Sequence, residues 1–156
     1  MPENAASFPK SQIERILAES AVQVLETMFF TLPAEEPVEF EPDQDIVTCI
    51  KFRGNPNGEF YHRINRRAAA ELAANFLGQD PGEEVTDEQI YSVTSELTNV
   101  MAGAVLSCLE SDSLFELDPP LSCPPDSWSV APEAAFCRIE LENGRIELCL
   151  DIKQAA

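Results

Sequence analysis

The sequence predicts an α+β domain in which a mostly antiparallel sheet packs against two long helices and one short helix. Three observations lead to this expectation. The chain ends in two alternating apolar stretches around a tight turn, it holds an earlier pair of β-rich runs, and helical periodicity lies before and between these pairs. Strands grouped in hairpins, with helices between the pairs, are typical of antiparallel sheets rather than of doubly wound parallel ones.

The 156 residues are expected to form one domain, 1–156, with flexible ends at 1–8 and 154–156. A chain of this length buries a continuous core without disulfides or a structural metal. Hydrophobic residues make up 44% and charged residues 24%, which is ordinary for a globular protein.

The first helix is predicted over residues 11–30. Ser11 and Glu14 have the spacing of a capping box, and apolar residues recur behind them at helical intervals. The proline-rich acidic stretch that follows predicts an exposed connection.

A hairpin and a short helix come next. The runs "DIVTCIKFRG" and "EFYHRIN" flank "GNPNG" and predict an antiparallel pair. Asn65 is expected to cap the helix "RRAAAELAANFL", and Gly78 to end it in the left-handed conformation.

The longest helix is predicted over 87–110, because Thr86 and Gln89 form a second capping box. The segment 111–135 holds five prolines, which allow only short strands such as "SLFEL" and "SWSVA". In "FCRIELENGRIELCLDIK" apolar and charged residues alternate on both sides of a turn at Asn143-Gly144, so one face of this hairpin should lie on the helices.

The charge of the chain limits its partners. With 28 acidic against 10 basic residues, the formal net charge is -18, and such a surface repels nucleic acid and anionic membranes. No apolar run approaches the length of a membrane span, so no membrane insertion is expected. Five scattered cysteines without a C-x-x-C pair predict reduced, buried thiols in a cytoplasmic protein.

One side of the longest helix carries a polar stripe that holds no charge beyond Glu96. In it Glu96 and Asn99 lie three positions apart and can reach the same point in space. An amide cannot act as a general base, but it can hold a water for attack on a phosphoryl group, while the glutamate binds a cation. On spacing alone a solvated face is the more common explanation, with Gly103 packed against a strand. The stripe comprises Glu88, Ser92, Ser95, Glu96, Asn99, Gly103 and Ser107.

The motif Ser92-x-x-x-Glu96-x-x-Asn99, followed by Val100-Met101-Ala102-Gly103, resembles the signature of the CheC/CheX/FliY chemotaxis phosphatases. The order of predicted elements resembles this CheC-like fold over nearly the whole chain, and the length suits the single-site CheX branch. The family pattern places a proline near Ser122, where this chain has prolines on either side instead.

The resemblance implies an aspartyl-phosphate phosphatase acting on a phosphorylated CheY-type response regulator. Glu96 would pair with the regulator's lysine, and Asn99 would orient the attacking water. Ser92 and Gly103 would support or contact the partner, the Mg²⁺ would be the regulator's, and no cofactor of its own is implied. A homodimer is also implied. Val22 stands where a second site would need asparagine, so one site per chain is expected.

Two function classes remain, the phosphatase and a non-catalytic member of the same fold. A non-catalytic binding or scaffolding module could keep the fold and use the long helix or the sheet edge for docking. The single histidine, His62, lies in a predicted strand without a nearby nucleophile and is expected to be structural. No cysteine or histidine cluster has zinc spacing, so no metal site is predicted.

Overall fold

The computed structural model describes residues 9–37, 39, 44–54, 56–80, 83–109 and 114–153. The predicted ends 1–8 and 154–156 lie outside this part. Within it the α-helices are α1 (Lys10–Met28), α2 (Arg66–Leu77) and α3 (Asp87–Leu109). The strands are β1 (Asp45–Arg53), β2 (Asn57–Asn65), β3 (Glu116–Leu117), β4 (Leu121–Cys123), β5 (Ala135–Leu141) and β6 (Gly144–Lys153), with a short 3₁₀ turn, η2, at Pro125–Ser127.

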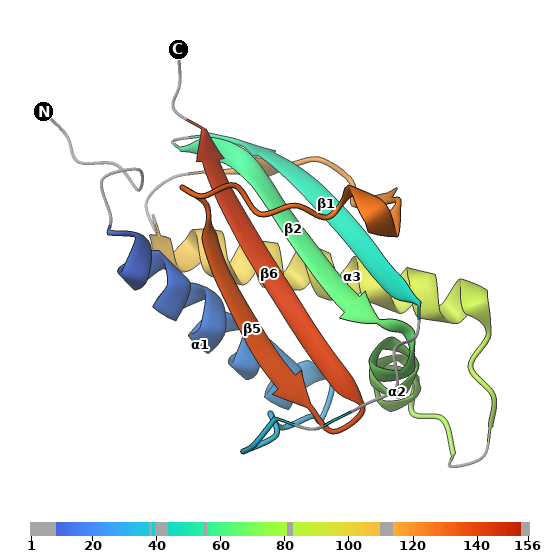
Figure 1. The fold of residues 1–156 in the computed structure, drawn as a ribbon. Helices are drawn as coiled ribbons and strands as arrows, with labels where there is room; N and C mark the ends of the chain where they lie inside the picture. Colours follow the sequence, from blue (N-terminus) through green and yellow to red (C-terminus); the bar gives the residue numbers. More distant parts are fainter. Residues whose placement is uncertain are drawn as a thin grey trace, which may run out of the picture.

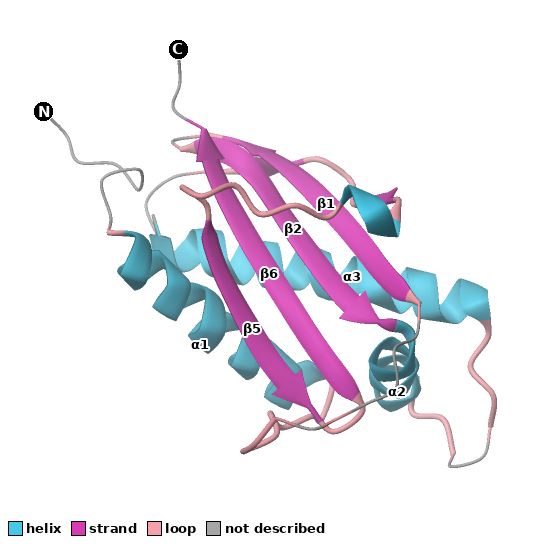
Figure 2. Cartoon of the chain, viewed as in Figure 1, coloured by secondary structure: helices cyan, strands magenta, loops and turns pink. Residues whose placement is uncertain are grey.

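The strands form one antiparallel sheet in the order β3-β1-β2-β6-β5, and β4 also pairs with β1. The helices pack against one face of this sheet, and the segment that follows β4 crosses the opposite face (Figure 1). Figure 2 shows the same two-layer arrangement of helices and strands. The predicted α+β fold with a mostly antiparallel sheet is therefore confirmed.

The core lies between the sheet and the helices. Alternate strand residues such as Phe60, Ile64 and Leu148 point into it, where they meet Leu17 and Leu97 from the long helices. Period-two alternation in the strands and helical periodicity in α1 and α3 thus converge on one apolar layer.

The predicted first helix is confirmed, but its capping box is wrong. The helix begins at Lys10 after Pro9, and among the described residues no side chain caps its first turn. Instead, the carboxylate of Glu14 accepts a hydrogen bond from the backbone N–H of Phe136, at 2.9 Å. The glutamate is drawn to the edge strand β5, whose N–H group needs an acceptor.

Asn65 stands at the expected N-cap of α2 but does not cap it. Its amide donates to the carbonyl of Asn143 at 3.0 Å, and its oxygen accepts from the N–H of Arg145 at 3.0 Å. This side chain fills the space where a Cβ on Gly144 would lie, and Gly144 has φ +153°. The pairing of Leu141 with Gly144 makes Glu142–Asn143 the two-residue loop of the hairpin, one position earlier than predicted.

The proline-rich segment also differs from its prediction. "SLFEL" contains β3, but "SWSVA" forms no strand, and β4 lies before it instead. Trp128 leaves the sheet edge and covers the outer face, where the guanidinium of Arg63 lies 4.8 Å from its ring centre. A cation–π contact, and not strand pairing, thus links Trp128 to the sheet.

The cysteine prediction is confirmed only in part. All five thiols are free, but only Cys49 and Cys149 are buried, and Cys108 on α3 is exposed. Cys108 is exposed because the buried stripe of α3 turns around the helix axis as the helix crosses the strands. The same turn brings Thr94 and Thr98 into core positions.

Candidate active site

Helix α3 positions the candidate site. Its N-terminus is held by the predicted capping box: Gln89 N–H donates to Thr86 Oγ1 at 3.1 Å, and Thr86 N–H donates to Gln89 Oε1 at 3.0 Å. The helix then continues for 23 residues with its apolar side on the sheet. Its polar stripe consequently points away from the core, and the side chains of Glu96 and Asn99 are exposed.

A groove runs along this stripe. One wall is α3, and the other is the segment that follows β3, so residues about twenty positions apart in the chain face each other. The groove has a volume of ≈ 320 Å³ and is broadly open to solvent. Its lining comprises Ser92, Ser95, Glu96, Asn99, Leu117, Asp118, Pro119 and Pro120.

Three of the four predicted site residues, Ser92, Glu96 and Asn99, therefore line one groove. The diproline Pro119-Pro120 forms part of the opposite wall. The sequence does not predict this wall: it shows prolines on either side of Ser122, but no local pattern places them against α3. The short pairing of β3 with β1 and the hydrogen bond from Asp118 N–H to the carbonyl of Lys51, at 2.8 Å, hold the wall there.

The fourth residue, Gly103, does not line the groove. A Cβ built on it would meet no heavy atom of the described residues within 4 Å, apart from the backbone of its own helix turn. Close packing of Gly103 against a neighbouring strand, one of the two explanations that the sequence left open, is therefore wrong. The glycine leaves an open place on the helix surface one turn beyond Asn99.

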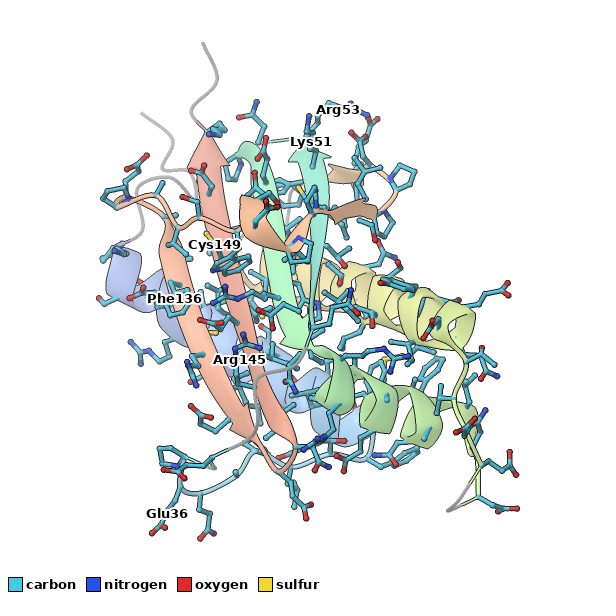
Figure 3. The ribbon with its side chains drawn as sticks, turned by 45° about the vertical axis from the view of Figure 1, so that its right-hand side comes forward. Glu36, Lys51, Arg53, Phe136, Arg145 and Cys149 are labelled. Carbon is cyan, nitrogen blue, oxygen red and sulfur yellow. The ribbon has the colours of Figure 1, made fainter. Side chains whose placement is uncertain are left out.

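The polar groups of Glu96 and Asn99 are available to a partner. Neither has a hydrogen bond or ion pair within the part of the chain that the structure describes. The other carboxylate of the groove, Asp118, lies 3.0 Å from the guanidinium of Arg53. Arg53 stands at the end of β1 (Figure 3). Glu96 is thus the groove carboxylate whose charge no described cation offsets.

A buried contact supports the helix beneath the site. Thr98 Oγ1 donates to the carbonyl of Thr94 at 2.8 Å, so it accepts from Nδ1 of His62 on β2, 2.9 Å away. The ring is completely buried, and this burial lowers the pKa of His62 from 6.5 to about 3. His62 is neutral, which agrees with the structural role predicted for it.

The described residues contain no group of three or more His, Cys, Asp or Glu side chains arranged to hold a metal ion. Nor do they include a helix long and apolar enough to cross a membrane.

Comparisons with known proteins agree on the fold. The CheX–CheY–BeF₃–Mg²⁺ complex from Borrelia burgdorferi gives a TM-score of 0.70 at 17% identity, over 90% of this chain and 97% of the matched chain. CheX from Vibrio vulnificus gives 0.69 at 19% identity, over 94% and 100%. FliY from Thermotoga maritima gives 0.58 at 17% identity, over 90% and 88%. Among curated proteins, none matches the chain.

The family described as chemotaxis phosphatase CheX matches residues 46–142. This match spans well over half of the chain and includes the whole of α3 with its groove. The chain therefore belongs to the CheX chemotaxis phosphatase family.

Proposed function

We propose that this protein hydrolyses the phosphoaspartate of a CheY-type response regulator. The observation that carries the proposal is the exposure of Glu96 and Asn99, both without partners among the described residues, in one open groove of α3. Small-molecule sites are usually enclosed and bury most of their ligand. A groove this open suits a substrate that brings most of the site with it, as the surface of another protein does.

Each residue has a distinct task in this proposal. The carboxylate of Glu96 pairs with a lysine at the regulator's active site, which fixes the orientation of the two proteins. The amide of Asn99 accepts from and donates to the water that attacks phosphorus, while the aspartate carboxylate leaves. The Mg²⁺ that neutralises the phosphoryl charge is the regulator's. Ser92 supports the helix surface, and the bare backbone at Gly103 gives the partner room.

The family membership and the structural similarity to a CheX bound to CheY support this choice of partner. The local charge supports it too, because the pairing of Asp118 with Arg53 leaves Glu96 as the groove carboxylate that attracts a cation. A cytoplasmic location follows from such a partner and is proposed with it.

The test is the decay of the acyl phosphate on the cognate regulator with Mg²⁺ present. We expect the wild-type protein to accelerate the decay, and Asn99→Ala to bind the regulator but to be slower by about 10²-fold or more, because its water is no longer positioned. Gln23→Ala, which removes an exposed amide from α1, is the matched control and should behave as wild type.

If neither wild type nor variant changes the decay of any response regulator from the same cell, the catalytic proposal fails. A binding or scaffolding module would then be the better account.

We also propose a homodimer, as the family resemblance implies. Light scattering coupled to size exclusion should give about twice the mass of 17.2 kDa. A monomer mass over the whole micromolar range would contradict this.

A further inference from the structure

A second groove lies beside the candidate active site on the same two elements. It has a volume of ≈ 420 Å³ and is bordered by Tyr91 of α3 and by Ser122, Cys123 and Pro125 of the proline-rich segment. Both walls of the first groove thus continue into this one, toward the N-terminus of the helix.

The floor of this second groove is apolar. Ile46 and Val47 at the start of β1 are among its lining residues, and both are buried, with 5% and 2% of their surface exposed. Tyr91 stands at the rim with 45% of its surface exposed. A half-exposed aromatic ring over an apolar floor is the arrangement found at the energetic centres of protein interfaces, where tyrosine is enriched.

Helix geometry relates the two grooves. Tyr91, Ser95 and Asn99 are spaced at i, i+4 and i+8, so they form one row along the helix. The distance from Tyr91 to Asn99 along the axis is about 12 Å. A protein that places its phosphoaspartate at Asn99 therefore covers Tyr91 as well, because even a small protein interface is wider than this.

The charges beside the second groove indicate which kind of residue a partner protein would place next to it. Glu88, three positions before Tyr91, presents an exposed carboxylate on the same side of the helix. Asp45 at the other border is already paired with Arg145, at 2.9 Å. An apolar side chain flanked by a lysine or arginine complements this rim.

We propose that the Tyr91 groove receives an apolar side chain of the response regulator, about 12 Å from its phosphoaspartate, and so sets the affinity for that regulator. This inference rests on the proposed function and names a specificity determinant outside the Glu96 and Asn99 pair. Tyr91 binds and does not take part in the chemistry.

The test separates kcat from KM in the dephosphorylation assay. Tyr91→Ala should raise KM by about 10-fold, the usual effect of truncating an interface aromatic, and leave kcat unchanged. Tyr91→Phe should stay near wild type. Ser122→Trp, which fills the groove from its other wall, should raise KM as well. Phe30→Ala removes an aromatic side chain that is 74% exposed outside both grooves and should change neither constant.

A parallel binding assay distinguishes failure of this inference from failure of the proposed function. It uses the regulator carrying beryllofluoride and Mg²⁺ in place of the phosphoryl group, so no hydrolysis is needed. If wild type binds but does not hydrolyse, and Tyr91→Ala binds less tightly, the groove assignment stands and the phosphatase proposal fails.

Two results overturn the inference while hydrolysis persists. One is an unchanged KM in both Tyr91→Ala and Ser122→Trp. The other is an unchanged KM accompanied by a lower urea midpoint for Tyr91→Ala, which would mean that the chain itself covers the groove.

Discussion

At the scale of single residues, the contact between His62 and Thr98 joins the sheet to the helix that carries the candidate site. Thr98 uses its hydroxyl proton on the carbonyl of Thr94, so Nδ1 of His62 must be the protonated nitrogen. The other nitrogen, Nε2, is buried without a hydrogen-bond partner among the described residues. Protonation would place a charge in the core, which is why burial depresses the pKa of this ring.

His62 should make stability depend on pH. Its pKa is about 3 in the folded protein against 6.5 for the free side chain, so below pH 6.5 the unfolded state binds more protons. The free energy of unfolding therefore falls as pH falls, by about 2 kcal/mol from this group between pH 7 and pH 5. Urea unfolding at these two pH values measures the change.

His62→Asn provides the comparison, because its amide can still donate to Thr98 but does not titrate. We expect this variant to lose most of the difference in unfolding free energy between pH 7 and pH 5. An equal difference in both proteins would show that other groups, and not His62, produce it.

At the scale of elements, the two capping-box motifs have different outcomes. Thr86 and Gln89 exchange both hydrogen bonds at the start of α3. Ser11 and Glu14 have the same spacing, but Glu14 binds the backbone of β5 and Ser11 caps nothing. A capping-box motif shows which hydrogen bonds can form within the first turn of a helix. A side chain of the motif bonds instead to a group of another element when that group lies closer.

Thr86→Ala should lower the free energy of unfolding by about 1 kcal/mol, the usual effect of losing an N-cap. Ser11→Ala should lower it by much less, since no cap is lost. The measurement is the urea midpoint of both variants at one pH. Equal losses would contradict the assignment of the two helix starts.

The buried stripe of α3 shows where helical periodicity is insufficient to predict which residues are buried. If the same side of an ideal helix faced the core along its whole length, Cys108 would be buried, and Thr94 and Thr98 would lie at the flank of the buried side. In the structure Thr94 and Thr98 are buried and Cys108 is exposed. The strands cross the helix at an angle, so the buried arc moves around the helix along its length. The exposed positions of Glu96 and Asn99, near the middle of α3, are insensitive to this shift.

At the scale of the whole molecule, the net charge of -18 opposes the compact state. Like charges lie closer together in the folded chain than in the unfolded one, so their repulsion lowers stability. Ion pairs such as Arg63 with Glu147 and Arg53 with Asp118 offset only part of this repulsion, because the chain has 10 basic residues against 28 acidic ones.

Salt should therefore stabilise this protein. Raising NaCl from about 10 mM to about 150 mM shortens the Debye length from about 30 Å to about 8 Å. We expect the melting temperature to rise by about 2–4 °C, equivalent to about 1 kcal/mol in a chain of this size. Close to the isoelectric point of about 4.2, where the net charge vanishes, the same salt step should have little effect. A rise of equal size there would assign the effect to something other than charge repulsion.

The sequence by itself determined the fold class, both hairpins, the three helices and the groups that stand on the exposed side of α3. These features follow from local periodicity, turn residues and capping, which act over a few neighbouring positions. The tertiary structure alone decided that Pro119-Pro120 faces Glu96 and Asn99, that Tyr91 borders a second groove, and that Asn65 binds the β5–β6 turn instead of capping a helix. Each of these joins segments far apart in the chain, and such contacts depend on packing that no local pattern encodes.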